Sequence, residues 1–230
     1  MRHRPRACAT AVPVAVPAQV GAPSGEGARR RASARDGAVP VVRDLRGRDG
    51  RTPCELRFTE GDLVVVSGLP GSGKSTLMRR TVPGARIDSQ DTRERWARRM
   101  PAKLPYAVYR PLVRLAHYVR LWRTLRGGGG VVVHDCGTQA WVRRWLAREA
   151  GRRGARLHLL LLDVPAEQAL AGQLGRGRRV SRYAFGRHRR TTARLIASAA
   201  RGRLPRGCAS AVLLDRPAAD RLSAIRLDGR

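Results

Sequence analysis

The stretch Gly68-Leu69-Pro70-Gly71-Ser72-Gly73-Lys74-Ser75-Thr76 decides the fold of this 230-residue chain. It fits the pattern G-x-x-x-x-G-K-[ST] of a phosphate-binding loop. Glycines let the backbone turn tightly, so several N–H groups can point at one anion. A helix that starts directly after the loop adds its positive N-terminal end. The motif therefore predicts a site for a nucleoside triphosphate.

The residues around the loop support this prediction over a chance match in a glycine-rich chain. A short β-branched run, 63–66, precedes the loop and predicts a buried strand, and 77–80 continues into a helix. We expect Lys74 to reach the β- and γ-phosphates of ATP and Ser75 to hold Mg²⁺. The predicted nucleotide-binding residues are Gly68, Gly71, Ser72, Gly73, Lys74, Ser75 and Thr76.

The formal net charge is +30, and the sequence pI is near 11.9. A nucleic-acid partner is one explanation, and a compositional bias toward Arg is the other. The bias is favoured because arginines are spread along the whole chain and only Lys74 and Lys103 are lysines. The charge would still promote non-specific binding to nucleic acid.

Cysteines and hydropathy indicate a cytoplasmic protein without a membrane span. No apolar run approaches the roughly 20 residues of a membrane helix. The four cysteines form no C-x-x-C pair, which argues against a zinc site or a disulfide framework; they are Cys8, Cys54, Cys136 and Cys208.

The sequence predicts one folded domain that follows a disordered N-terminal extension. Residues 1–50 are rich in Arg, Pro and Ala and predict a disordered extension, while 51–230 form the folded domain. The basic start and the apolar segment 7–20 faintly resemble a secretion signal, but Pro13 and Pro17 interrupt the apolar segment.

Within the folded domain, an edge strand is expected at 55–59.

The second informative place follows a short strand at 85–88. Carboxylates at the carboxyl end of a strand beside the phosphate loop lie where open α/β sheets bind ligands. Asp88 or Asp91 can accept a proton from a substrate hydroxyl, and Asp91 can instead be a helix N-cap. Arg93 can bind a substrate anion or simply face solvent.

A third strand, 131–135, ends in Asp135, which is placed to hold Mg²⁺ through water. Before it, the helical pattern 104–126 predicts an apolar stripe that is mostly core. Two further strands are expected at 157–163 and 211–215. The sequence thus predicts an α/β fold with five strands.

A glycine- and arginine-rich stretch between the last two strands, 174–182, predicts a lid. In phosphoryl transfer, a lid closes over ATP and an Arg neutralises the transferring group. The alternative is a basic loop in a chain full of Arg. We assign Arg176 and Arg179 as catalytic and Arg178 as nucleotide-binding.

Together these features resemble the P-loop kinases, in particular the "AAA family ATPase" proteins of the group with polynucleotide 5′-kinases, zeta toxins and chloramphenicol phosphotransferases. The resemblance covers about 56–225 and implies a parallel sheet of order 2-3-1-4-5 with helices on both faces. It implies catalytic roles for Lys74 and Asp88 and a substrate role for Arg93. The polynucleotide kinases have an Asp three residues before that Arg, where this chain has Gln90.

Two functions remain open. One is a kinase that uses ATP and Mg²⁺ to phosphorylate a hydroxyl, on a small molecule or a nucleic-acid end. The other is a nucleic-acid-binding switch that hydrolyses ATP without a phosphorylated product. No spacing in the sequence identifies the acceptor or the oligomeric state.

Overall fold

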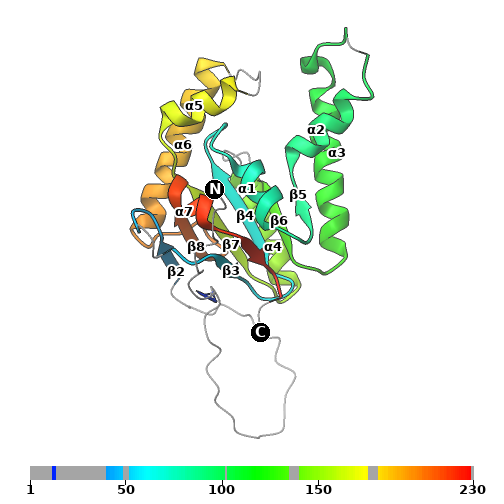
Figure 1. Cartoon of the computed structure of the whole chain (residues 1–230). Coiled ribbons are helices and arrows are strands. Elements are labelled where there is room, and N and C mark those ends of the chain that lie inside the picture. The colour runs from blue at the N-terminus through cyan, green and yellow to red at the C-terminus, as the bar shows by residue number, and fades with distance from the viewer. Residues whose placement is uncertain are drawn as a thin grey trace, which may run out of the picture.

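The computed structural model describes residues 12–13, 40–48, 52–101, 103–134, 140–175 and 181–228. A parallel sheet has helices on both faces, and further helices rise beyond one edge of it (Figure 1). The strands are β1 (Val12–Pro13), β2 (Val41–Asp44), β3 (Glu55–Arg57), β4 (Leu63–Gly68), β5 (Arg86–Ile87), β6 (Val131–His134), β7 (Leu157–Leu162), β8 (Cys208–Leu214) and β9 (Ala224–Arg226). The helices are α1 (Lys74–Thr81), α2 (Ser89–Ala97), α3 (Tyr106–Arg126), α4 (Ala140–Arg152), α5 (Ala166–Leu174), α6 (Arg182–Ala200) and α7 (Arg216–Arg221).

The main sheet has six strands in the order β2-β8-β7-β4-β6-β5, all parallel. Its last five strands have the predicted order, which confirms the α/β class. The prediction of five strands is wrong by one, because β2 pairs with β8 at the edge. Since β2 lies within 1–50, the folded domain begins before residue 51.

A second, smaller sheet has the order β1-β3-β9. The strand expected at 55–59 is therefore present as β3 but does not belong to the main sheet. Its Leu56 is fully buried, together with Phe58 and Ile225. This small sheet extends the hydrophobic core beneath one face of the main sheet.

Alternation along β4 divides the core into two layers. Val64 and Val66 face the layer that contains α1 and α7, whereas Leu63 and Val65 face the layer that contains α3, α4 and α6. All four side chains are fully buried, as expected for a central parallel strand covered on both faces. The phosphate-binding loop follows β4 and so lies at the carboxyl edge of the sheet.

The sequence predicts that the apolar stripe of α3 is mostly core, but many of the apolar side chains of α3 are exposed. Val113, Leu121 and Leu125 are buried, but a second apolar row remains exposed by 36–63%; it consists of Val108, Leu112, Leu115, Val119 and Trp122. Within the described residues, no helix is both long enough and apolar enough to cross a membrane.

Cysteine pairing also differs from expectation. Cys54 is disulfide-bonded, whereas Cys208 is a free thiol. The sequence argued against a disulfide framework from spacing along the chain, and spacing does not show which cysteines the fold brings together.

A buried polar pair links the start of β4 to the centre of the sheet. His158 Nε2 lies 3.0 Å from Asp62 Oδ2, and His158 Nδ1 lies 2.7 Å from Ser210 Oγ. The same carboxylate accepts hydrogen bonds from the backbone N–H groups of Arg156 and Thr59. His158 is therefore a core histidine with both ring nitrogens satisfied.

We expect the Asp62→Asn variant to lower the free energy of unfolding by about 2 kcal/mol. The new amide N–H₂ group would point at N–H groups that now donate to the carboxylate, so a hydrogen bond would be lost. Burial raises the pKa of Asp62, but the hydrogen bonds from His158 and Arg156 outweigh it, so the pKa lies below its usual value. The carboxylate's stabilisation is thus complete above that usual value and is lost as the pH falls through the folded-state pKa. Urea denaturation between pH 2 and pH 7 measures both effects. The exposed neighbour variant Glu60→Gln should match wild type; equal losses in the two variants would contradict the assignment.

Candidate functional site

The predicted phosphate-binding loop joins β4 to α1 as the motif requires. Gly73 has φ 94°, a left-handed conformation that favours glycine, and α1 begins at the next residue. Lys74 Nζ donates hydrogen bonds to the carbonyl oxygens of Gly68 at 2.8 Å and Leu69 at 2.6 Å. Lys74 and Ser75 are each only 5% exposed, while Thr76 is exposed. The ammonium is thereby held within the loop.

Helix α5 packs directly against this loop. A Cβ atom built on Gly172 would lie 2.5 Å from the carbonyl oxygen of Gly71, and one on Gly71 would lie 2.0 Å from that of Ala169. Gln173 Nε2 also donates a hydrogen bond of 3.0 Å to the carbonyl oxygen of Pro70. Both glycines are needed for this close approach, which fixes the loop against the helix leading into 176–180.

We expect Gly172→Ala to weaken ATP binding about 10-fold, because the new methyl group displaces the loop from α5; an overpacked contact of this kind typically costs about 1–3 kcal/mol. Titration calorimetry with ATP and Mg²⁺ measures the effect. The matched control is Gly186→Ala in α6, where the added methyl group meets no atom within 4 Å. That variant should bind ATP normally. Its free energy of unfolding should rise, because alanine is more favourable than glycine in a helix interior. Unchanged binding by Gly172→Ala would show that the contact does not shape the loop.

Arg216 is a candidate site residue that the sequence analysis missed. A Cβ atom on Gly73 would lie 2.6 Å from one terminal nitrogen of the Arg216 guanidinium, so this side chain covers the loop. Arg216 is the first residue of α7 and follows Asp215, whose carboxylate caps that helix through Ala218 N at 2.8 Å. In a chain with so many arginines, no local pattern distinguishes this one.

Asp88 lies at the carboxyl edge of the sheet, directly after β5. Its side chain is fully buried, and Oδ1 accepts a hydrogen bond of 2.9 Å from Gln90 N at the start of α2. Asp88 is thus the N-cap, and the alternative that assigned this role to Asp91 is wrong, because Asp91 lies within the first helical turn. Oδ2 of Asp88 is buried and has no hydrogen-bond partner among the described residues.

His134 and Ser89 lie beside this carboxylate. His134 Nδ1 is 3.0 Å from Ser89 Oγ and 3.6 Å from Asp88 Oδ1. Burial, together with the positive charge of Lys74, lowers the pKa of His134 to about 3, against the opposing attraction of Asp88. The imidazole is therefore neutral at pH 7. The influence of Lys74 on His134 also shows that Asp88 and the loop lysine share one electrostatic environment.

A cleft of about 550 Å³ opens next to these residues, between α2 and α3 on one side and α4 and α6 on the other. Arg93 lines it, and its guanidinium lies 4.0 Å above the centre of the Tyr106 ring. Neither Asp88 nor Asp91 is among the lining residues. The polar residues that line the cleft are Ser89, Gln90, Arg93, Tyr106, Arg110, Arg114, His117, Tyr118, His134, Arg143, Ser181, Arg187 and His188.

Several predicted site residues fall outside the described part of the chain. They are the lid arginines Arg176, Arg178 and Arg179 and the predicted metal ligand Asp135. The segments on either side are described: α5 ends at Leu174 against the loop, and β6 ends at His134 beside Asp88. The structure therefore places Asp88 beside His134, whose pKa the charge of Lys74 lowers, and it places Arg93 in the wall of the cleft.

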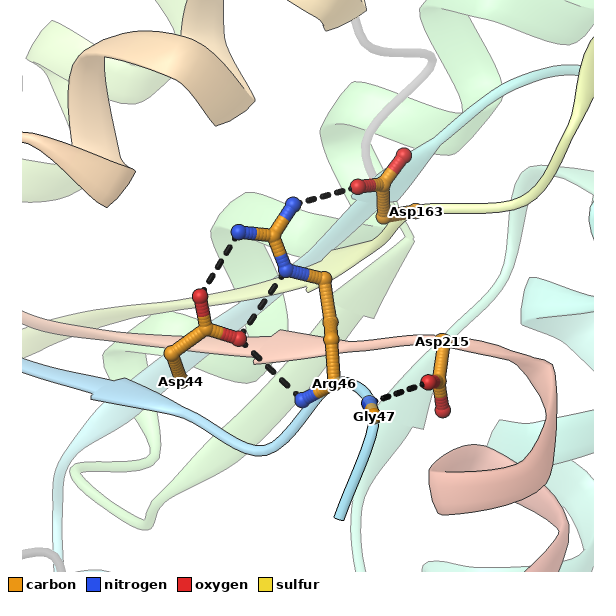
Figure 2. Close-up of polar contacts among 5 residues, drawn as sticks. All are labelled: Asp44, Arg46, Gly47, Asp163 and Asp215. Atoms are coloured by element: carbon orange, nitrogen blue, oxygen red, sulfur yellow. Dashed lines mark hydrogen bonds and ion pairs between the residues drawn. The ribbon is translucent and has the colours of Figure 1, made fainter.

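A cluster of charged side chains lies at the carboxyl edge of the sheet, next to the end of β2 (Figure 2). Arg46 donates hydrogen bonds to Asp44, through Nε at 2.9 Å, and to Asp163, while Gly47 N donates to Asp215 at 2.7 Å. The bond to Asp44 raises the pKa of Arg46, so the guanidinium stays charged. Because Asp163 follows β7 and Asp215 follows β8, the cluster fastens β2 to the carboxyl edge.

The chemistry of the oxygen donors tests whether this site fits Mg²⁺. Ser75 offers a buried hydroxyl at the start of α1, the position that the phosphate-loop motif gives to the metal-binding Ser or Thr. Among the described residues, no cluster of three or more His, Cys, Asp or Glu could form a complete metal cage. Mg²⁺ usually keeps several water ligands and binds substrate phosphates, so it needs only a few oxygen ligands from the protein. The residues present therefore fit Mg²⁺.

Comparisons with known proteins give a matching family model and several similar solved structures. A family model described as an AAA domain matches residues 63–201. No curated protein sequence matches the chain. One similar solved structure comes from the PezAT chromosomal toxin–antitoxin system of Streptococcus pneumoniae, with 15% identity and a TM-score of 0.42; the match covers 50% of this chain and 52% of that one.

Two other solved structures are also similar. The tunicamycin resistance protein of Deinococcus radiodurans has 16% identity and a TM-score of 0.38, with 59% of this chain and 80% of that one covered. A protein of Chloroflexus aurantiacus J-10-fl, provisionally described as a kinase, has 13% identity and a TM-score of 0.46, with coverage of 67% and 84%.

Proposed function

The chain belongs to this AAA-domain family of P-loop proteins, and we propose that it is a kinase that transfers the γ-phosphate of ATP to a hydroxyl acceptor in the presence of Mg²⁺. The acceptor is a small molecule or a nucleic-acid end. The observation that favours transfer over simple nucleotide binding is the buried Asp88 carboxylate, whose Oδ2 has no partner among the described residues. An orphaned buried carboxylate oxygen is costly unless a ligand uses it.

In this proposal, the chain's own residues divide the work. Lys74, held in the loop, and Arg216, lying over it, offset the negative charge of the triphosphate. Asp88 Oδ2 orients the acceptor hydroxyl and takes its proton while the new O–P bond forms and ADP leaves with the electrons of the broken bond. Arg93, with the lid residues Arg176, Arg178 and Arg179, would neutralise further charge.

Ser75, with Asp135 through water, would hold Mg²⁺, and the ion would supply positive charge that offsets the triphosphate. His134 supports the same arrangement as a neutral neighbour of Asp88. Because its imidazole does not carry a positive charge at pH 7, it leaves the carboxylate available as a base.

The formal charge of +30 favours a second candidate, a nucleic-acid-binding switch that hydrolyses ATP. A product balance separates the two functions. ADP and free phosphate are measured together while the protein turns over ATP in the presence of a metabolite extract or 5′-hydroxyl oligonucleotides. A kinase forms more ADP than free phosphate; equal amounts of both under every condition would favour the switch.

A further inference from the structure

The cleft beside Asp88 has an unusual charge balance. Five arginines and three histidines line it, and none of its described lining residues is acidic. They come from separate elements: Arg93 from α2, Arg110 and Arg114 from α3, Arg143 from α4 and Arg187 from α6. Positive charges from four helices therefore converge on one cavity.

The cavity gathers these arginines without an acidic lining residue. Some arginines elsewhere in the described chain are paired with carboxylates, as Arg46 is with Asp44 and Asp163 and as Arg226 is with Glu55. Around the cleft, no ion pair within the described residues involves Arg110, Arg114 or Arg187.

The placement of these three arginines also costs stability. Arg110 and Arg114 are separated by one helical turn, where like charges repel. Arg187 faces them across the cleft from α6. Such an arrangement raises the local concentration of anions, and a bound anion would relieve the repulsion.

The size and position of the cleft suit an acceptor. A volume of about 550 Å³ lies within the usual range for small-molecule sites. Ser89, Gln90 and His134 line it, and all three lie beside Asp88 in the chain or in space. Arg93 is held in place over Tyr106. A molecule in the cleft would thus lie against the neighbours of the proposed base, with arginines around it.

We propose that the acceptor of this kinase is a polyanion: it presents a hydroxyl to Asp88 while Arg110, Arg114 and Arg187 bind its phosphate groups. This inference depends on the proposed kinase function. A phosphorylated small molecule and the phosphodiester backbone behind a 5′-hydroxyl nucleic-acid end both have this chemistry. Arginine suits it because the planar guanidinium binds phosphate oxygens in pairs.

The test separates acceptors by charge before their identity is known. A small-molecule extract is divided by anion exchange into an unretained fraction and a retained, anionic fraction. Each fraction, and separately a 5′-hydroxyl oligothymidylate of eight nucleotides, is incubated with the full chain, Mg²⁺ and γ-labelled ATP. We expect label to enter organic product only in the anionic fraction or the oligonucleotide, and which of the two is labelled distinguishes the sources.

Two triple variants, each removing three positive charges, make the test specific to the cleft. The cleft variant is Arg110→Gln, Arg114→Gln and Arg187→Gln. The control is Arg123→Gln, Arg190→Gln and Arg194→Gln, which are exposed positions on the same two helices outside the lining. The cleft variant should raise the acceptor KM by about 30-fold or more, since each charged hydrogen bond contributes substantially. The control should change KM by less than about 2-fold, and the Kd for ATP should be unchanged in both.

The outcomes distinguish failure of this inference from failure of the kinase proposal. Label transfer only in the unretained fraction, or equal KM changes in the two triple variants, would overturn the polyanionic acceptor and leave the kinase intact. Label that appears only as free phosphate in every fraction would overturn the kinase and this inference with it. Transfer that needs the anionic fraction and fails only in the cleft variant supports both.

Discussion

The Lys74→Ala variant should lose phosphoryl transfer by about 10²–10³-fold or more in kcat, the effect of removing one preorganised charge from such a site. Lys74 is 5% exposed, and two carbonyl oxygens of its own loop hold its ammonium group in place. The side chain is therefore already ordered before a nucleotide binds. Alanine there leaves the β- and γ-phosphates without their closest predicted cation. The measurement is kcat with labelled ATP, alongside a thermal melt that checks the fold.

The chain offers a natural control, because Lys103 is its only other lysine and is exposed. Lys103→Ala removes the same charge and should leave kcat unchanged. Lys74→Arg keeps the charge but not the compact geometry, and it should also be severely impaired. Near-normal transfer by Lys74→Ala in a folded protein would remove the basis for the nucleotide assignment.

The Asp88→Asn variant is the second change expected to have a very large effect. Asparagine caps a helix about as well as aspartate, so α2 and the fold should be preserved. The amide cannot accept the acceptor's proton, and we expect transfer to fall by about 10²–10⁴-fold. ATP affinity, measured by calorimetry, should stay within about 3-fold of wild type, because no described contact joins Asp88 to the loop backbone.

Asp91→Asn is the matched control, since it makes the same chemical change three residues further along the same helix. Asp91 lies in the first turn of α2 and does not cap it. It should therefore retain at least half of the wild-type kcat. Loss of transfer in Asp91→Asn with retention in Asp88→Asn would move the base to Asp91.

The sequence predicted the centre of the fold because its signals there are local. Val64, Val65 and Val66 are β-branched, directly precede the loop and are fully buried in β4. The strand order followed from the resemblance to P-loop kinases, and the structure confirms it for five strands.

The edge of the sheet could not be predicted in the same way. Strand β2 has four residues and only intermediate burial, so it shows no apolar run. Its attachment depends on the contact of Arg46 with Asp163, which is 117 positions away in the chain. Spacing between neighbouring residues contains no information about such a contact.

The candidate site was also only partly predictable. Asp88 was identified from its place after a strand, but its complete burial and its capping role depend on how α2 packs against His134 and the sheet. Arg216 lies over Gly73 from a helix near the end of the chain. Convergence of Arg110 and Arg187 requires α3 and α6 to be placed in space.

The most direct test of the central claim follows the γ-phosphate itself. Purified full-length protein is incubated with γ-labelled ATP, Mg²⁺ and either a metabolite extract or 5′-hydroxyl oligonucleotides, with Lys74→Ala as the control. We predict that label enters an organic acceptor with the wild-type protein and not with the variant. Label found only as free phosphate, or the same labelled product from the variant, would contradict the assignment as a kinase.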